Sequence, residues 1–201
     1  MDKTRFTSRP AHHKDASDLA WLHYISHTLS FQTFAARQWI KSRKFQEYQE
    51  FWELFLPELT DQEITWTIWR EECLVGTVTI KELRNSSQIF RPNKVPDLLL
   101  DKACCLRLMY VHPDFLREGI GGELMGSARS FMEDCDYQLG ILITHAANGR
   151  ARGFYEGKGW LLEEIFRDQV KEFFEEPEEM QARARYYLDL AGGSLSSQTE
   201  E

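Results

Sequence analysis

The chain has 201 residues, of which 42% are hydrophobic, 13% aromatic and 28% charged, and its formal net charge at pH 7 is −8. This length and composition are typical of one globular domain and exclude a mostly disordered or collagen-like chain. Residues 101–201 hold 19 acidic side chains against 11 basic ones, so nucleic acid is not expected as a partner.

The sequence contains no run of apolar residues long enough to span a membrane, and its charged first fifteen residues do not resemble a signal peptide. We expect one domain over residues 1–190 and a disordered tail over residues 191–201. The cysteines lack the paired spacing of a metal site, which indicates a reduced, cytoplasmic chain without a metal. They are Cys73, Cys104, Cys105 and Cys135.

Two helical regions and a hairpin are predicted in the first eighty residues. Apolar residues three to four apart predict a helix over residues 18–30, and an aromatic stripe predicts another over residues 34–56. The period then changes to two, which predicts antiparallel strands over residues 64–69 and 73–80. Gly76 marks a bulge or a close approach of two segments.

The rest of the chain alternates strands with helices. Residues 84–103, which contain two prolines, are expected to form a long loop. A nearly continuous apolar run over residues 104–111 is typical of a central strand covered on both faces. Further elements are predicted as a helix from Ile120 to Cys135, a strand over residues 139–144, a helix from Asn148 to Gly157, and strands over residues 160–166 and 184–190.

A glycine-rich loop lies between the strand at residues 104–111 and the helix that follows it. Glycines let successive N–H groups converge on an anion, and the positive end of a helix favours one there. The loop therefore reads as a phosphate cradle, or alternatively as a tight turn. It lacks the third glycine of a dinucleotide fingerprint, where Leu124 stands, and the Gly-Lys-Ser/Thr of a P-loop. Its residues are Arg117, Glu118, Gly119, Ile120, Gly121 and Gly122.

Two segments together resemble the GCN5-related N-acetyltransferase (GNAT) superfamily. The run LMYVHP at residues 108–113, followed by Arg117 and the glycine loop, is similar to the acyl-CoA-binding motif of that family. The segment NGRARGFYEGKGW at residues 148–160 resembles a second family segment that ends in Gly-Phe, with Trp160 replacing the phenylalanine. Cys105 stands where many relatives carry a glutamate that can accept a proton.

The resemblance implies an α/β fold with a mixed, mostly antiparallel sheet of six or seven strands and helices on both faces. It also implies acetyl-CoA as cosubstrate, with its pyrophosphate on the N–H groups of residues 118–122 beside Arg117 and with Asn148 contacting its arm. Tyr155 would be the acid for the departing thiolate, with a buried core tyrosine as the alternative. The pantetheine arm would pair with the strand edge at Met109, Tyr110 and Val111.

The function implied is transfer of an acetyl group from acetyl-CoA to an amine by direct attack, or alternatively a non-catalytic acyl-CoA-binding module. His145, Glu82 or a relay of waters could take the amine's proton. The acidic stretch at residues 163–179 would attract a cationic small-molecule or peptide amine, or would simply be a solvated surface. The aromatic N-terminal helices would permit a homodimer.

Overall fold

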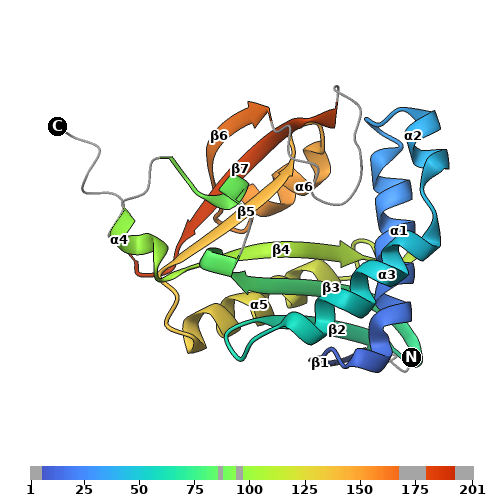
Figure 1. Cartoon of the computed structure of the whole chain (residues 1–201), viewed down its shortest axis with the longest axis horizontal. Helices are drawn as coiled ribbons and strands as arrows, with labels where there is room; N and C mark the ends of the chain where they lie inside the picture. The colour runs from blue at the N-terminus through green and yellow to red at the C-terminus, as the bar shows by residue number, and fades with distance from the viewer. Residues whose placement is uncertain (1–5, 86–87, 94–96, 168–179, 193–201) are drawn as a thin grey trace. The chain divides into compact units, whose positions relative to one another are not determined.

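The structure is a computed structural model, and it describes residues 6–85, 88–93, 97–167 and 180–192 (Figure 1). It contains one sheet of seven strands in the order β1-β2-β3-β4-β5-β7-β6. The strands are β1 (Phe6–Pro10), β2 (Ile64–Arg70), β3 (Cys73–Glu82), β4 (Ala103–Val111), β5 (Leu139–His145), β6 (Leu161–Arg167) and β7 (Ala182–Asp189). The α-helices are α1 (Ala16–Phe31), α2 (Arg37–Ser42), α3 (Phe45–Phe55), α4 (Asp97–Leu100), α5 (Ile120–Asp134) and α6 (Gly149–Glu156).

The sheet is mixed, as the resemblance implies. β1 pairs antiparallel with β2, and β2 with β3, while β7 lies antiparallel between β5 and β6. β4 and β5 are parallel, with α5 as the connection between them. This strand–helix–strand unit is the one that the apolar runs and the helical period predict.

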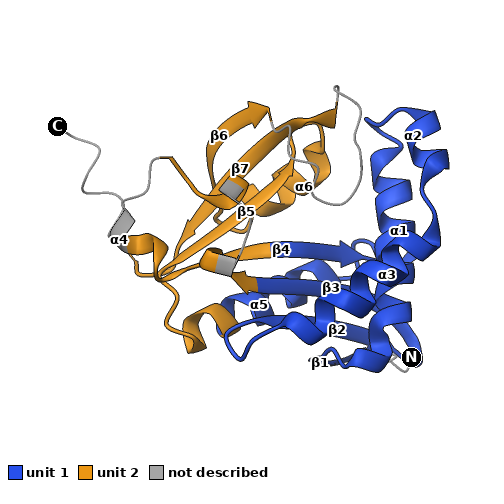
Figure 2. Ribbon diagram, in the orientation of Figure 1, with its two compact units in different colours: residues 1–80, 107–130 blue, residues 81–106, 131–201 orange. Residues whose placement is uncertain are grey.

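The chain divides into two compact units, which Figure 2 shows in blue and orange. Unit 1 comprises residues 1–80 and 107–130, and unit 2 comprises residues 81–106 and 131–201. β3 and β4 each contribute residues to both units. A single domain over residues 1–190 stays a prediction.

In unit 1, α1 packs against α3, and their facing side chains form a large part of its core. The predicted aromatic stripe is confirmed, since Tyr48, Trp52 and Phe55 are buried. The helix predicted over residues 34–56 is instead two helices, because Arg43 and Lys44 adopt extended backbone conformations. The Glu47 side chain accepts a hydrogen bond from the Lys44 N–H at 3.3 Å, which caps the start of α3.

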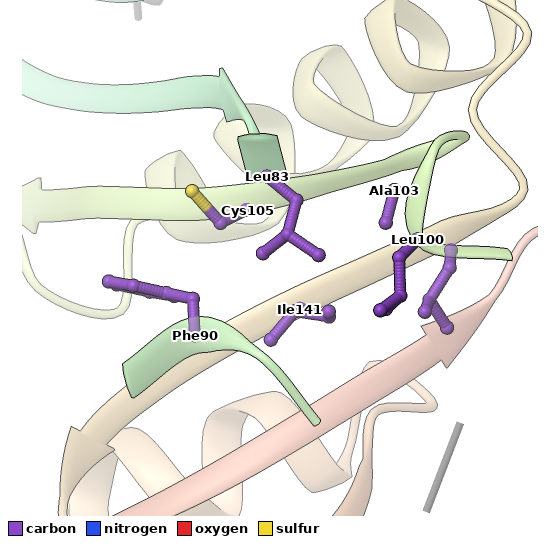
Figure 3. Packing of buried hydrophobic residues seen from close by; sticks show 7 residues of the cluster. Leu83, Phe90, Leu100, Ala103, Cys105 and Ile141 are labelled. Atoms are coloured by element: carbon purple, nitrogen blue, oxygen red, sulfur yellow. The ribbon is translucent and has the colours of Figure 1, made fainter. Parts of the chain in front are cut away.

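In unit 2, an apolar cluster gathers side chains from β4, β5 and the segment before β4 (Figure 3). The loop predicted over residues 84–103 is therefore partly wrong, because Phe90 and Leu100 are buried in this cluster and α4 lies within the segment. The buried members are Leu83, Phe90, Leu100, Ala103, Cys105, Leu139 and Ile141.

The helix and strand predictions for residues 104–167 and 182–189 are confirmed to within a few residues. Strand β1 was not predicted. The expected tail lies outside the described residues except for residues 191 and 192, and so does most of the acidic stretch, residues 168–179. None of the helices in the described part of the chain is long and apolar enough to cross a membrane.

Candidate active site

The glycine-rich loop connects β4 to α5 within unit 1. β4 ends at Val111, a short 3-10 helix follows at Pro113–Phe115, and α5 begins at Ile120. His112 is structural here, because its Nδ1 accepts a hydrogen bond from the Asp114 N–H at 3.3 Å and caps the short helix. The loop is thus held at both ends by regular structure.

Gly76 on β3 fixes the start of α5. A Cβ atom built on Gly76 would lie 2.6 Å from Cγ2 of Ile120 and 3.0 Å from Cδ1 of Leu124, so only glycine admits this approach. Ile120 and Leu124 are 1% and 0% exposed. The predicted close approach is confirmed, and it anchors the first turn of α5 on the strand.

The backbone amides of residues 118–122 lie where the chain passes from β4 into α5. Arg117 and Gly119 have positive φ angles of 68° and 90°, which turn the chain sharply into α5. Within the described part of the chain, none of these five amides donates a hydrogen bond to a carbonyl or a side chain; the first such bond is from the Glu123 N–H to the Gly119 carbonyl, at 3.0 Å. Unused amides at a helix start can bind an anion.

Charged side chains also line this loop. The Arg117 side chain is exposed. The Arg70 guanidinium on β2 lies 3.8 Å from the Glu118 carboxylate. It also packs on the Phe115 ring, 5.3 Å from the ring centroid. Arg70 therefore offsets the negative charge of Glu118 in the loop.

Pairing between β4 and β5 is short. The register runs from Ala103 opposite Leu139 to Leu106 opposite Leu142, and it covers only these four pairs among the described residues. β4 continues through Met109, Tyr110 and Val111, the residues expected to bind the pantetheine arm. Beyond Leu106, β3 is the strand that β4 keeps as a neighbour.

Two buried polar side chains of α1 contact the end of β4, and the sequence analysis missed both. Nε2 of His23 lies 2.8 Å from the Tyr110 hydroxyl, and the two rings stack with centroids 4.4 Å apart. The Ser26 hydroxyl donates to the Val111 carbonyl at 3.3 Å. Burial lowers the pKa of His23 to about 3, so the ring is neutral at neutral pH.

In unit 2, Asn148 and Tyr155 lie at the two ends of α6. Asn148 is the predicted N-cap, and its Oδ1 accepts a hydrogen bond from the Ala151 N–H at 3.1 Å. The Tyr155 ring is 9% exposed and packs near the rings of Trp160 and Tyr186. Burial raises the pKa of the Tyr155 phenol, which keeps it protonated at neutral pH.

His145 ends β5 and is a poor proton acceptor in this setting. Its Nδ1 lies 3.0 Å from the Met180 carbonyl and 2.7 Å from NH1 of Arg183. Burial lowers its pKa to about 3, and the positive charge of Arg183 acts in the same direction. The imidazole therefore holds a proton weakly at neutral pH.

Other candidates for the base are also constrained. The Glu82 side chain is nearly buried and forms an ion pair with Arg84 at 2.7 Å. Cys105 is fully buried in the apolar cluster of Figure 3 and so cannot replace the glutamate that many relatives carry at this position. No group of three His, Cys, Asp or Glu residues that could hold a metal ion occurs in the described ranges.

The beginning of the acidic stretch is structural. Glu163 is buried and accepts a hydrogen bond from Nε of Arg185 at 2.5 Å, and Glu164 pairs with the same guanidinium at 2.9 Å. These two carboxylates are therefore engaged by Arg185, and residues 168–179 of the stretch lie outside the described residues.

A family model matches more than half of the chain. Residues 27–160 match the family model described as "Acetyltransferase (GNAT) family". No curated protein matches the chain. Residues 108–113, the glycine loop and Asn148–Trp160 all lie inside the matched region.

Solved acetyltransferase structures share the fold. The PaiA N-acetyltransferase of Thermoplasma acidophilum, in complex with coenzyme A, is 14% identical, covers 92% of this chain and 99% of its own, and has a TM-score of 0.63. YncA of Salmonella typhimurium, with acetyl-CoA, is 12% identical, with coverages of 92% and 94% and a TM-score of 0.62. The ribosomal-protein-S18-alanine N-acetyltransferase of Escherichia coli is 15% identical, with the same coverages and a TM-score of 0.58.

Proposed function

Because the chain belongs to the acetyltransferase (GNAT) family and is an acetyl-CoA-dependent N-acetyltransferase, we propose that residues 118–122 hold the pyrophosphate of the coenzyme. The observation that carries this proposal is the run of five unused amides at the start of α5. The helix dipole favours an anion there, and the exposed guanidinium of Arg117 adds positive potential.

The pantetheine arm runs along the part of β4 that no longer pairs with β5. Its amides would pair with the backbone of Met109, Tyr110 and Val111, as an added strand does at a sheet edge. A backbone N–H of Met109 or Val111 would donate to the thioester oxygen. Such a fixed donor stabilises the negative charge that develops on this oxygen when the amine attacks.

The reaction is direct transfer. The amine nitrogen forms a bond to the acetyl carbon, the carbon–sulfur bond breaks, and the thiolate leaves with the bonding pair. Tyr155, whose phenol is protonated at neutral pH, donates its O–H to the departing sulfur, and the phenolate regains a proton from solvent when the thiol leaves. Asn148 caps α6, which carries Tyr155, and its side chain contacts the coenzyme arm.

The amine must lose a proton before or during attack, because an aliphatic amine has a pKa of about 10. With a pKa of about 3, His145 would rarely keep that proton at neutral pH. We therefore assign the proton to a relay of waters in preference to His145, and the proton reaches bulk solvent by that route.

The acceptor is a small-molecule or peptide amine, and we propose that it is cationic. The support for this is the excess of carboxylates in the C-terminal half of the chain, which attracts cations.

All four cysteines are free thiols, which supports a cytoplasmic location. Cell fractionation would test the location, and light scattering would test the predicted homodimer.

The experiment that tests the function measures thiol release from acetyl-CoA with three amines: a polyamine, a lysine-containing peptide and a neutral aromatic amine. Wild-type protein should turn over at least one of them, with the highest kcat/KM for the polyamine. Tyr155→Phe should lower kcat by roughly 100-fold, because a positioned acid contributes about 10²- to 10⁴-fold. Its affinity for CoA, measured by calorimetry, should stay within about twofold of wild type.

The matched control is Tyr187→Phe, which removes the hydroxyl of a half-buried tyrosine on β7 that has no part in the proposed site. Its kcat should equal that of wild type. Calorimetry that detects no CoA binding would contradict the amide cradle. Full activity of Tyr155→Phe would contradict the role of Tyr155, and a neutral amine as the best acceptor would contradict the cationic substrate.

A further inference from the structure

The end of β4 needs support from outside the sheet. Within the described residues the register with β5 stops at Leu106, and from there to Val111 the strand keeps β3 as its neighbouring strand. A strand with one neighbour is held less firmly than one with two. Helix α1 supplies contacts to this stretch of β4.

Both sides of one peptide group are held at that point. The Val111 carbonyl accepts a hydrogen bond from the Ser26 hydroxyl at 3.3 Å. The N–H of His112, which belongs to the same peptide group, donates to the Val75 carbonyl on β3 at 2.8 Å. The plane of this peptide is therefore fixed between α1 and β3.

The preceding residue is held as well. The His23 ring stacks on Tyr110 at 4.4 Å between centroids, with Nε2 2.8 Å from the Tyr110 hydroxyl. His23 and Ser26 are three residues apart, so they lie on the same face of α1. The last two residues of β4 are thus each held by one polar side chain of this helix.

These two side chains are costly for a purely structural role. His23 and Ser26 are each 4% exposed, on a helix whose other core positions are mostly apolar. Nδ1 of His23 has no hydrogen-bond partner within the described part of the chain, and a buried polar atom without a partner destabilises the fold. An apolar ring would fill the same space without this cost.

We propose that His23 and Ser26 are positioning residues that fix the backbone of Tyr110 and Val111 for binding of the thioester. The inference rests on the proposed function, because it takes this end of β4 as the donor to the thioester oxygen. A donor acts in catalysis only when it is held near the position that the oxyanion will occupy, and a misplacement of about 1 Å can lower the rate about 100-fold.

The test separates acetyl transfer from coenzyme binding and from stability. Ser26→Ala removes the bond to the Val111 carbonyl, and His23→Phe keeps an aromatic ring but removes both nitrogens. Each variant should lower kcat by roughly tenfold. CoA affinity should fall by a smaller factor than kcat, because the amides of residues 118–122 would still hold the pyrophosphate in both variants. The urea midpoint of His23→Phe should stay close to that of wild type, because removal of the unpartnered Nδ1 offsets the loss of the bond to the Tyr110 hydroxyl.

The control on the same helix is Ser30→Ala, whose hydroxyl makes none of the hydrogen bonds described for this chain; its kcat should match wild type. His23→Phe and Tyr110→Phe should be non-additive, with the double variant no slower than the slower single variant. Wild-type kcat in both Ser26→Ala and His23→Phe would overturn the inference, as would losses of kcat and CoA affinity by equal factors. A wild-type protein that does not bind acetyl-CoA would overturn the proposed function, and the inference with it.

Discussion

Gly76 shows how one residue can place a binding loop. It lies on β3 beneath Ile120, the first residue of α5, and the approach is closer than any side chain would permit. Ile120 lies within the loop, so a shift of Ile120 would move the amides of residues 118–122 that are proposed to bind the pyrophosphate. A residue without a side chain therefore positions a site to which it does not belong.

Gly76→Ala should lower the free energy of unfolding by about 1–3 kcal/mol, because the added methyl overpacks the contact with Ile120 and Leu124. It should also weaken CoA binding. Gly126→Ala is the matched control, since a Cβ there meets nothing within 4 Å, and it should add about 0.5–1 kcal/mol by favouring α5. Urea titration of both variants checks the prediction, which a wild-type midpoint for Gly76→Ala would contradict.

Local signals at the residue scale could be read from the sequence, and tertiary ones could not. Asn148 as a cap and Gly76 as a close approach follow from residue type and spacing. The roles of His23 and Ser26 depend on which strand α1 meets. The signal in the sequence is a pair of polar residues three apart on an otherwise apolar helix face. A prediction based on the spacing of the leucines does not use this signal.

At the scale of elements, a buried ion pair joins β6 and β7 to the segment before α4. The Arg185 side chain bonds to Glu163 at 2.5 Å and to the Ile89 carbonyl at 2.8 Å. Glu163 also accepts a hydrogen bond from the Asn93 N–H at 2.7 Å. Three segments that are far apart in the sequence thus share one carboxylate and one guanidinium.

Glu163→Gln should lower the free energy of unfolding by roughly 3 kcal/mol, because it leaves the Arg185 charge buried without its main counterion. Glu164→Gln is the matched control on the same strand. Its side chain is 38% exposed, so the loss should stay below about 1 kcal/mol. Equal effects of the two substitutions in chemical denaturation would contradict the assignment of the buried pair.

Elements with strong internal periodicity could be predicted, and those held by partners could not. The β2–β3 hairpin carries a period of two and α5 a period of 3.6, and β5 is a short, nearly continuous apolar run. β1 is five residues long and is held by its pairing with β2. Its own sequence is too short to predict this pairing. The break between α2 and α3 falls at two basic residues that the helical period spans without interruption.

For the whole molecule, buried histidines set how stability depends on pH. Burial lowers the pKa of His23 and of His145 to about 3 in the folded chain, against about 6.5 in an unfolded chain. Between these values the unfolded chain binds more protons than the folded one. Stability therefore falls as the pH drops from about 6.5 toward 3, and these two groups add no pH dependence above about 7.

The urea midpoint of the wild type should thus be lower at about pH 5 than at about pH 7. His23→Phe should show a smaller decrease, because it removes one of the two buried histidines. The titratable side chains that contact His23 are His27, Tyr48 and Tyr110. Equal midpoints of the wild type at the two pH values would contradict the prediction. A decrease as large in His23→Phe as in the wild type would show that His23 does not contribute.

The division of the chain into its two units also has a genetic consequence. The polypeptide passes between the units after residues 80, 106 and 130, so neither unit is encoded by one uninterrupted stretch of gene. A premature stop codon after residue 130 would keep every residue of unit 1, yet it would leave residues 81–106 without β5, the partner of β4. Recombination that exchanges one unit between homologues therefore needs three crossover points, where a terminal module would need one.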